Sequence, residues 1–245
     1  MTAVGVIPAR YESSRFPGKP LVRIAGLPML QHVWEGSRRA KSLRTVIVAT
    51  DDERIAEACR SFGAEVALTG ADHPTGTDRL AEVAQGLDDE IVVNVQGDEP
   101  LIEGFVIDAV VETLAADPDL PMATAVHAAE AQALDDPNRV KVVLDRRGDA
   151  LYFSRSCIPA RRNPARETPS WQHVGLYAYR RSFLLEFVAL APTPLERAEA
   201  LEQLRALEHG HRIRCAVVDG WRSVPVDVPA DVALVEARLR ELGRC

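Results

Sequence analysis

A loop rich in cations follows the first apolar segment of the chain. Residues 8–20 read Pro-Ala-Arg-Tyr-Glu-Ser-Ser-Arg-Phe-Pro-Gly-Lys-Pro, which places Arg10, Arg15 and Lys19 within one short loop. Gly18 gives the backbone freedom to turn beside Lys19. Cationic side chains and exposed backbone N–H groups are suited to bind phosphate. The loop is therefore a candidate triphosphate site, although a solvated basic turn explains the composition equally well.

Two aspartates are candidates for binding a divalent cation. Asp98 lies in Asn-Val-Gln-Gly-Asp-Glu-Pro, just after an apolar run, and Gly97 allows the backbone to bend there. Mg²⁺ in enzymes binds a few carboxylates together with phosphate oxygens and water, so an acidic residue in this place is chemically apt. Asp227, in Val-Asp-Val-Pro-Ala, precedes the last amphipathic segment. Each residue taken alone is also explained as a turn or helix cap.

Other phosphate and metal motifs do not fit. The basic loop is not a P-loop, because Ser13 stands at the position of the first glycine and Pro20 at that of the Ser/Thr; no GxGxxG motif is present either. Asp117-Pro-Asp119 spells the DxD pattern of many glycosyltransferases, but it lies between a predicted helix and a predicted strand, and its proline favours a turn. We expect Asp117 to lie at the opposite edge of the sheet, outside the site.

The first half of the chain must position the basic loop and Asp98. Short β-branched runs alternate there with amphipathic segments, which is typical of a parallel sheet covered by helices. The predicted strands are residues 4–7, 45–50, 65–69 and 91–96, and the predicted helices are residues 28–40, 55–62, 77–87 and 104–115. Ligands of open α/β sheets bind outside the carboxyl ends of the strands, which is where both features lie.

Strands dominate the region from about residue 120 to 185. Predicted strands at residues 122–127, 140–145, 150–154 and 173–179 are followed by helices at 182–190 and 195–209, a strand at 213–218 and a helix at 230–242. We predict a single domain, residues 1–245, with a nucleotide-binding core of about residues 1–118 and 205–245 and a smaller mixed-β lobe of about residues 119–204. Because an uncovered sheet edge is usually paired, this lobe predicts a homodimer.

Composition narrows the class of protein. The chain has 245 residues, of which 47% are hydrophobic and 27% charged, as in ordinary globular proteins. Its net charge of −7 repels nucleic acid at long range. The four cysteines form no CxxC pair, so neither a disulfide framework nor a zinc site is expected. The apolar N-terminal run is too short for a signal peptide, and no apolar stretch has membrane-spanning length, so we predict a cytoplasmic protein without membrane contact.

The string PARY…SRFPGKPL resembles the nucleotide-binding signature of sugar nucleotidyltransferases, in particular that of the Kdo (3-deoxy-D-manno-octulosonate) cytidylyltransferase family. Similar segments follow in the same order along nearly the whole chain: ATDDERIAEA, ADHPTGTDRLAEV, NVQGDEPLI, VKVVLD…ALYFSR, HVGLYAYR, LEQLRALEHG and VDVPADV. The resemblance implies a Rossmann-like nucleotidyltransferase fold, with a mostly parallel central sheet flanked by helices and a smaller mixed-β lobe. It also implies transfer of CMP from CTP to Kdo with release of pyrophosphate, an activation step for lipopolysaccharide inner-core synthesis.

The resemblance also assigns residues on the nucleotide side. It implies that Lys19, Asp98, Asp227 and Arg10 are catalytic and that both aspartates bind Mg²⁺. The residues implied to contact CTP are Pro8, Ala9, Arg10, Arg15, Lys19, Thr77, Arg79 and Gln96. Thr77 is in addition the expected N-cap of the helix that follows it.

On the sugar side the resemblance implies one set of polar residues that binds the carboxylate and hydroxyls of Kdo. These are Gln96, Arg155, His173, Tyr177, Glu202 and Gln203. Ordinary strand and helix positions explain several of them as well. The loop from Arg161 to Trp171 is short and basic compared with the family, which leaves the local sugar contacts open. Another acid sugar, such as 8-amino-Kdo or a sialic acid, is the alternative acceptor, and a nucleotide-binding homologue without turnover is the alternative class.

Overall fold

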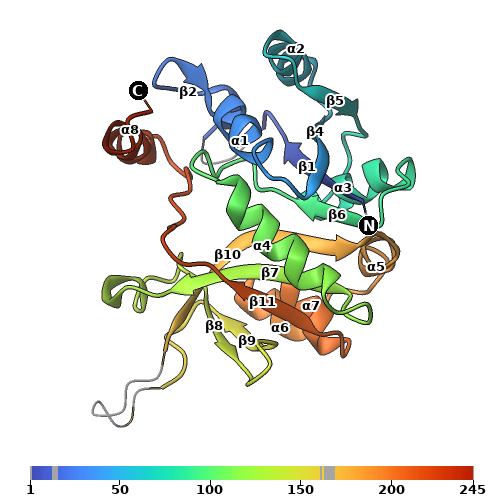
Figure 1. Ribbon diagram of the computed structural model, residues 1–245, viewed down its shortest axis with the longest axis vertical. Coiled ribbons are helices and arrows are strands. Elements are labelled where there is room, and N and C mark those ends of the chain that lie inside the picture. The colour runs from blue at the N-terminus through green and yellow to red at the C-terminus, as the bar shows by residue number, and fades with distance from the viewer. Residues whose placement is uncertain (1, 13–15, 161, 163–168, 245) are drawn as a thin grey trace. The chain divides into compact units, whose positions relative to one another are not determined.

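The first strand, β1 (Ala3–Ala9), is a run of small and β-branched residues that are almost all buried. Figure 1 shows it in the computed structural model of the chain, which describes residues 2–12, 16–160, 162 and 169–244. The chain divides into two compact units, one formed by Met1–Asp108 with Arg222–Cys245 and the other by Ala109–Trp221. The core and lobe boundaries expected from the sequence remain a prediction.

β1 is an inner strand of the parallel sheet in the first unit. It pairs with β6 (Ile91–Asn94) on one side and with β4 (Leu43–Thr50) on the other, and β4 pairs with β5 (Glu65–Leu68). Val6, Val48 and Val92 are fully buried, as expected for a parallel sheet that is covered on both faces. The predicted α/β fold class is therefore confirmed, and the strands match their predicted ranges to within a few residues.

The helices of the first unit are α1 (Met29–Ser37), α2 (Glu53–Ser61), α3 (Gly76–Gln85) and α8 (Asp231–Glu241), while α4 (Gly104–Ala115) contains the sequence boundary between the units. The predicted N-cap of α3 is wrong. Thr75 caps this helix, because its hydroxyl accepts from the Asp78 N–H while the Asp78 carboxylate accepts from the Thr75 N–H. Thr77 lies inside the first turn and is buried.

A short segment before α1 was not predicted. A 3₁₀ turn (Lys19–Leu21) leads into a hairpin of β2 (Arg23–Ile24) and β3 (Leu27–Pro28). Ala25 and Gly26 both have positive φ, 47° and 86°, as a two-residue turn of this kind requires. The hairpin belongs to an apolar cluster of Ile24, Met29, Leu101, Val226, Val235 and Leu239, which gathers residues far apart in the sequence.

The sheet of the second unit is mixed, as predicted for the smaller lobe. β7 (Met122–Ala128) pairs antiparallel with β10 (Trp171–Arg180) and parallel with β11 (Ile213–Val217). β8 (Lys141–Leu144) pairs antiparallel with both β10 and β9 (Ala150–Ser154). The register of β10 against β7 shifts between Val174 and Tyr177, where Gly175 permits an irregular backbone.

One predicted helix of the second unit is wrong. Residues 195–209 form two short helices, α6 (Pro194–Glu199) and α7 (Gln203–Glu208), which follow α5 (Arg181–Phe187). Ala200 ends α6 in the left-handed region with φ 50°, so the helical hydrogen bonding cannot continue. Periodicity alone gave no sign of this break, because no glycine or proline marks it. Within the described residues, no helix combines the length and apolar character needed to cross a membrane.

Candidate active site

The loop after β1 turns sharply before Lys19. Gly18 has φ 72°, and a side chain at this position would approach the ring of Tyr11 to 3.3 Å. The Gly18 N–H donates to the Tyr11 carbonyl at 2.9 Å, which folds the loop back on itself. A glycine is therefore required here, and its conformation directs the chain into the 3₁₀ turn that begins with Lys19.

Lys19 joins two distant acidic segments. Its Nζ donates to Asp98 Oδ2 at 2.9 Å and to the Val226 carbonyl at 3.0 Å, and it lies 3.7 Å from Asp227 Oδ1. The Lys19 side chain is only 15% exposed. The structure thus brings together Lys19, Asp98 and Asp227, which only the family resemblance had placed in one site.

The backbone explains how the two aspartates reach this place. Asp98 follows β6, and Gly97 fits there because a side chain would lie 3.1 Å from the Pro8 carbonyl. The Val226 N–H donates to the Asp98 carbonyl at 2.9 Å, which ties the two segments together. The carboxylate of Asp231 accepts from the N–H groups of residues 227 and 228, at 2.8 and 2.9 Å. Asp231, the first residue of α8, therefore anchors the backbone on which Asp227 lies, and no side chain among the described residues caps this helix.

The donor set at Lys19 suits a magnesium ion bound together with a substrate phosphate. Asp98 and Asp227 are 31% and 40% exposed, so both carboxylates are open to a ligand. Among the described residues, no three or more His, Cys, Asp or Glu side chains form a cluster able to hold a metal ion. Mg²⁺ commonly takes one or two carboxylates and completes its coordination with phosphate oxygens and water, which is what this pair could offer.

The other residues expected to contact CTP differ in their exposure and in their contacts. Arg10 is exposed, and its Nη2 donates to the Pro74 carbonyl at 3.3 Å. Pro8, close to the end of β1, lies against the start of α3, since a side chain on Gly76 would approach the Pro8 ring to 3.3 Å. Arg79 is almost fully buried, and its guanidinium contacts Asp51 at 2.7 Å and the Thr69 hydroxyl. Arg15 lies outside the described residues.

In the second unit, the structure places His173 beside Tyr177. Their ring centroids are 5.4 Å apart, and His173 Nε2 is 3.0 Å from the Thr124 hydroxyl. Although His173 is only half-buried as a residue, burial of its imidazole lowers the pKa of His173 to about 3. Burial, followed by the negative charge of Glu202, raises the pKa of Tyr177 well above its usual value. Both side chains are therefore neutral hydrogen-bonding groups at physiological pH.

Arg155 has partners that the sequence did not reveal. Its guanidinium donates to the carbonyls of Glu199, Pro137 and Ala200, at 2.7, 3.0 and 3.3 Å. The Glu199 carboxylate accepts from the Arg155 N–H at 2.9 Å and from the Ser154 hydroxyl at 2.6 Å. In these contacts Arg155 holds backbone segments of the second unit together. Its expected role at the Kdo carboxylate remains a prediction.

The remaining residues expected to contact the sugar differ in burial and in the unit to which they belong. Gln203 begins α7 and is 4% exposed, whereas Glu202 immediately before it is partly exposed and lies 3.9 Å from Arg205. Gln96 belongs to the first unit, and its amide donates to Asn94 Oδ1 at 3.3 Å. Their assignment to the sugar remains a prediction.

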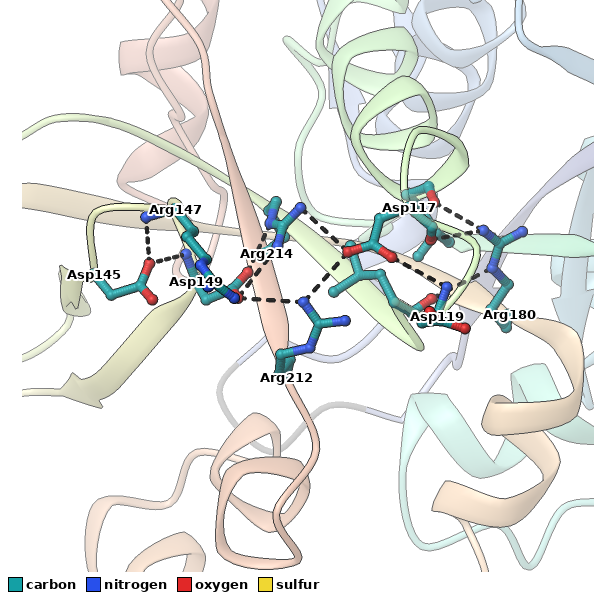
Figure 2. Close-up of polar contacts among 10 residues, drawn as sticks. Asp117, Asp119, Asp145, Arg147, Asp149, Arg180, Arg212 and Arg214 are labelled. Carbon is teal, nitrogen blue, oxygen red and sulfur yellow. Dashed lines mark hydrogen bonds and ion pairs between the residues drawn. The ribbon is translucent and has the colours of Figure 1, made fainter.

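The rejected DxD sequence forms part of an ion-pair network in the second unit, which Figure 2 shows. The Asp117 carboxylate accepts from the Asp119 N–H at 3.1 Å, and it also contacts Arg212 at 3.3 Å and Arg214 at 3.4 Å. Arg214 in turn pairs with Asp149 at 2.7 Å. Although desolvation opposes the effect, the Asp119 N–H and the neighbouring arginines hold the pKa of Asp117 below its usual value. The expected turn at this motif is confirmed by these contacts.

Open α/β sheets bind their ligands beyond the carboxyl ends of the parallel strands, which is where the basic loop and Asp98 lie. The chain matches the profile of the cytidylyltransferase family over residues 4–213. It is 52% identical to the 3-deoxy-manno-octulosonate cytidylyltransferase of Syntrophotalea carbinolica, over 99% of this chain and 100% of the relative. The enzyme of the same name from Syntrophobacter fumaroxidans is 54% identical, over 96% of both chains.

A solved structure agrees with these relatives. The structure of CMP:2-keto-3-deoxy-manno-octonic acid synthetase complexed with CTP superposes with a TM-score of 0.94 at 45% identity, covering 99% of this chain and 100% of that one. The chain therefore belongs to the 3-deoxy-manno-octulosonate cytidylyltransferase family, as the motifs had indicated.

Proposed function

We propose that the chain transfers CMP from CTP to the anomeric hydroxyl of Kdo, giving CMP-Kdo and pyrophosphate. The proposal is supported by full-length relatives that bear this activity in their names and by the similar structure complexed with CTP. The observation that carries it within this chain is the convergence of Lys19, Asp98 and Asp227 beyond the ends of the parallel strands. This arrangement can bind a polyphosphate and neutralise the negative charge that develops on it during the reaction.

The reaction is an in-line displacement at the α-phosphorus. The sugar oxygen forms a bond to phosphorus, the bond to the bridging oxygen of pyrophosphate breaks, and the hydroxyl proton is released. The residues of the chain would contribute mainly by positioning and by neutralising charge. Arg10 and Lys19 would bind the triphosphate and the departing pyrophosphate, and Asp98 and Asp227 would hold Mg²⁺. Bound Mg²⁺ would polarise the α-phosphate and lower the pKa of a coordinated hydroxyl.

His173 and Tyr177, which are both neutral, suit recognition of the sugar hydroxyls. With its pKa lowered to about 3, His173 remains uncharged at neutral pH and is a weak proton acceptor. The Thr124 hydroxyl also lies within 3.1 Å of the carbonyls of Val174 and Leu176, which are acceptors only. Thr124 can therefore donate to a carbonyl while it accepts from His173, which favours a proton on Nε2 of the imidazole. We propose that His173 orients the sugar that accepts CMP, rather than acting as a general base.

Pyrophosphate release tests the proposed reaction directly. The full chain is incubated with each of the four common ribonucleoside triphosphates and with Kdo, 8-amino-Kdo or a sialic acid, at ample Mg²⁺. We expect release with CTP and Kdo, and its loss when the divalent cation is removed with EDTA. Equal turnover with a sialic acid, or none with Kdo, would reject the assignment of the acceptor.

We also propose that the chain forms a homodimer through the second unit. β9 pairs with β8 along one side, and its residue Leu151 is 63% exposed. A second copy would remove this apolar side chain from water. Light scattering at micromolar concentration should give the mass of a dimer, and Leu151→Lys should shift it towards the monomer. Leu68→Lys, at a 57% exposed leucine in the first unit, is the matched control. A monomeric native chain would contradict the proposal.

A further inference from the structure

Asp227 lies on a segment without regular secondary structure. Residues 221–227 belong to no helix or strand, and the chain enters the first unit at Arg222. Such a segment has no ladder of backbone hydrogen bonds to fix its course. A site carboxylate must nevertheless be held to within a fraction of an ångström, so other contacts must fix the backbone around it.

One attachment point lies directly beside Asp227. The Val226 N–H donates to the Asp98 carbonyl at 2.9 Å, and the Val226 carbonyl accepts from Lys19 at 3.0 Å. The Val226 side chain is fully buried in the apolar cluster that includes Leu101. These contacts fix position 226, and the Asp231 carboxylate, which accepts from the N–H groups of residues 227 and 228, fixes the backbone on the downstream side.

Glu99 and Ser223 supply an attachment point upstream of Val226. The Ser223 hydroxyl donates a hydrogen bond to Glu99 Oε1, and the two residues are only 9% and 7% exposed. Glu99 is the neighbour of Asp98, and Ser223 precedes Asp227 by a few residues. The loop that carries Glu99 is itself held, because the Glu99 carbonyl accepts from the Ile102 N–H at 3.0 Å. The Glu99–Ser223 bond therefore holds the segment upstream of Val226, whereas Asp231 holds it downstream.

The contact needs only an acceptor oxygen at position 99. A buried polar side chain is unfavourable unless hydrogen bonds compensate it, and the Ser223 hydroxyl provides one such bond to Glu99. A glutamine has nearly the same shape and also carries an acceptor oxygen. Glu99→Gln should therefore keep most of the attachment, whereas loss of the Ser223 hydroxyl removes it.

We propose that Glu99 and Ser223 form a clasp that positions Asp227 relative to Asp98 and Lys19. Neither residue needs to touch substrate, since each acts through the backbone that carries an aspartate. The effect of the clasp on turnover rests on the proposed function. Its effect on the geometry of the free protein does not, so the two can be tested apart.

Hydrogen exchange of the free protein tests the geometry. Ser223→Ala removes the donor, and we expect the Val226 amide to exchange on the order of tenfold faster, the effect of losing about one hydrogen bond. Glu99→Gln keeps an acceptor oxygen and should give a smaller increase in the same amide. Ser61→Ala is the matched control, because Ser61 is exposed and donates only locally, to the Ala58 carbonyl. Unchanged exchange at Val226 in both clasp variants would overturn the proposal.

Measurement of kcat then distinguishes a positioning role of Ser223 from a general loss of stability. We expect Ser223→Ala to lower kcat by about tenfold, with little change in KM for CTP, and to lower it no further when Asp227 is already replaced by asparagine. If Ser223→Ala lowered kcat by the same factor in the native chain and in Asp227→Asn, the clasp would be overturned, because Ser223 would then not act through Asp227. If the native chain releases no pyrophosphate with CTP and Kdo, the proposed function fails, while hydrogen exchange still decides whether the clasp exists.

Discussion

Asp98→Asn and Asp227→Asn are each expected to lower kcat by about 10²–10³-fold, the usual effect of removing one group that stabilises charge in a transition state. Each substitution removes a negative charge while nearly preserving shape. The structure gives both carboxylates the same neighbour, because the Lys19 ammonium lies 2.9 Å from Asp98 and 3.7 Å from Asp227. They should therefore act as one unit, and the double variant should lose far less than the product of the single losses.

Stability should hardly change in these variants. Asp98 and Asp227 are 31% and 40% exposed, so water reaches both carboxylates. In each single variant the Lys19 ammonium, itself 15% exposed, keeps one carboxylate neighbour, so we expect a loss of about 1 kcal/mol in the free energy of unfolding. Urea unfolding of each variant checks this. Asp88→Asn, at an exposed position before β6, is the matched control and should keep full activity. Near-native turnover of Asp227→Asn at saturating Mg²⁺ would remove that residue from the mechanism.

Strands and most helices of this chain could be predicted because their residues carry a local signal. Buried β-branched runs such as residues 45–50 form strands wherever a parallel sheet is covered on both faces. The break between α6 and α7 has no such signal. Ala200 takes its left-handed conformation with φ 50° in a segment where Glu199 and Ala200 accept from Arg155 and Glu196 pairs with Arg205. Contacts of this kind, made between residues distant in the sequence, are invisible to periodicity.

The candidate site could likewise be predicted only in part from the sequence. Arg10, Lys19 and Asp98 follow strand ends, so their common edge could be inferred from topology. The approach of Asp227 could be inferred only from family resemblance, because residues 221–227 have no regular structure. The partner of Arg79 was missed for a related reason. Arg79 was assigned to CTP through the family resemblance, which gave no sign that its guanidinium contacts Asp51 at 2.7 Å.

Glu99 and Ser223 were missed because each residue type has an ordinary explanation by itself. A glutamate before a proline and a serine in a loop are typical of exposed turns, and their burial is a property of the folded unit alone. A short apolar motif around the serine, in Trp-Arg-Ser-Val-Pro-Val, was the only local sign that this segment packs against the core.

Lys19→Met is expected to lower kcat/KM for CTP by roughly 10- to 150-fold, which corresponds to the loss of one charge-assisted contact of about 1.5–3 kcal/mol. The loss should be larger in kcat if the ammonium binds pyrophosphate more strongly as it departs. Lys19→Arg, which keeps the charge but not the compact ammonium, should recover part of the activity. Activity of Lys19→Met equal to that of the native chain would make the loop a solvated turn.

The same variant has a consequence that does not depend on turnover. In the structure the ammonium lies between the two carboxylates that would hold Mg²⁺, and a divalent cation must compete with it for them. A triphosphate offers Lys19 other acceptors, so CTP should ease that competition. Mn²⁺ titrations followed by electron paramagnetic resonance should therefore show tighter binding to Lys19→Met than to the native chain when nucleotide is absent. Addition of CTP should strengthen Mn²⁺ binding more in the native chain than in the variant. Equal Mn²⁺ affinity of the two proteins without CTP would mean that the ammonium and the metal do not share these carboxylates.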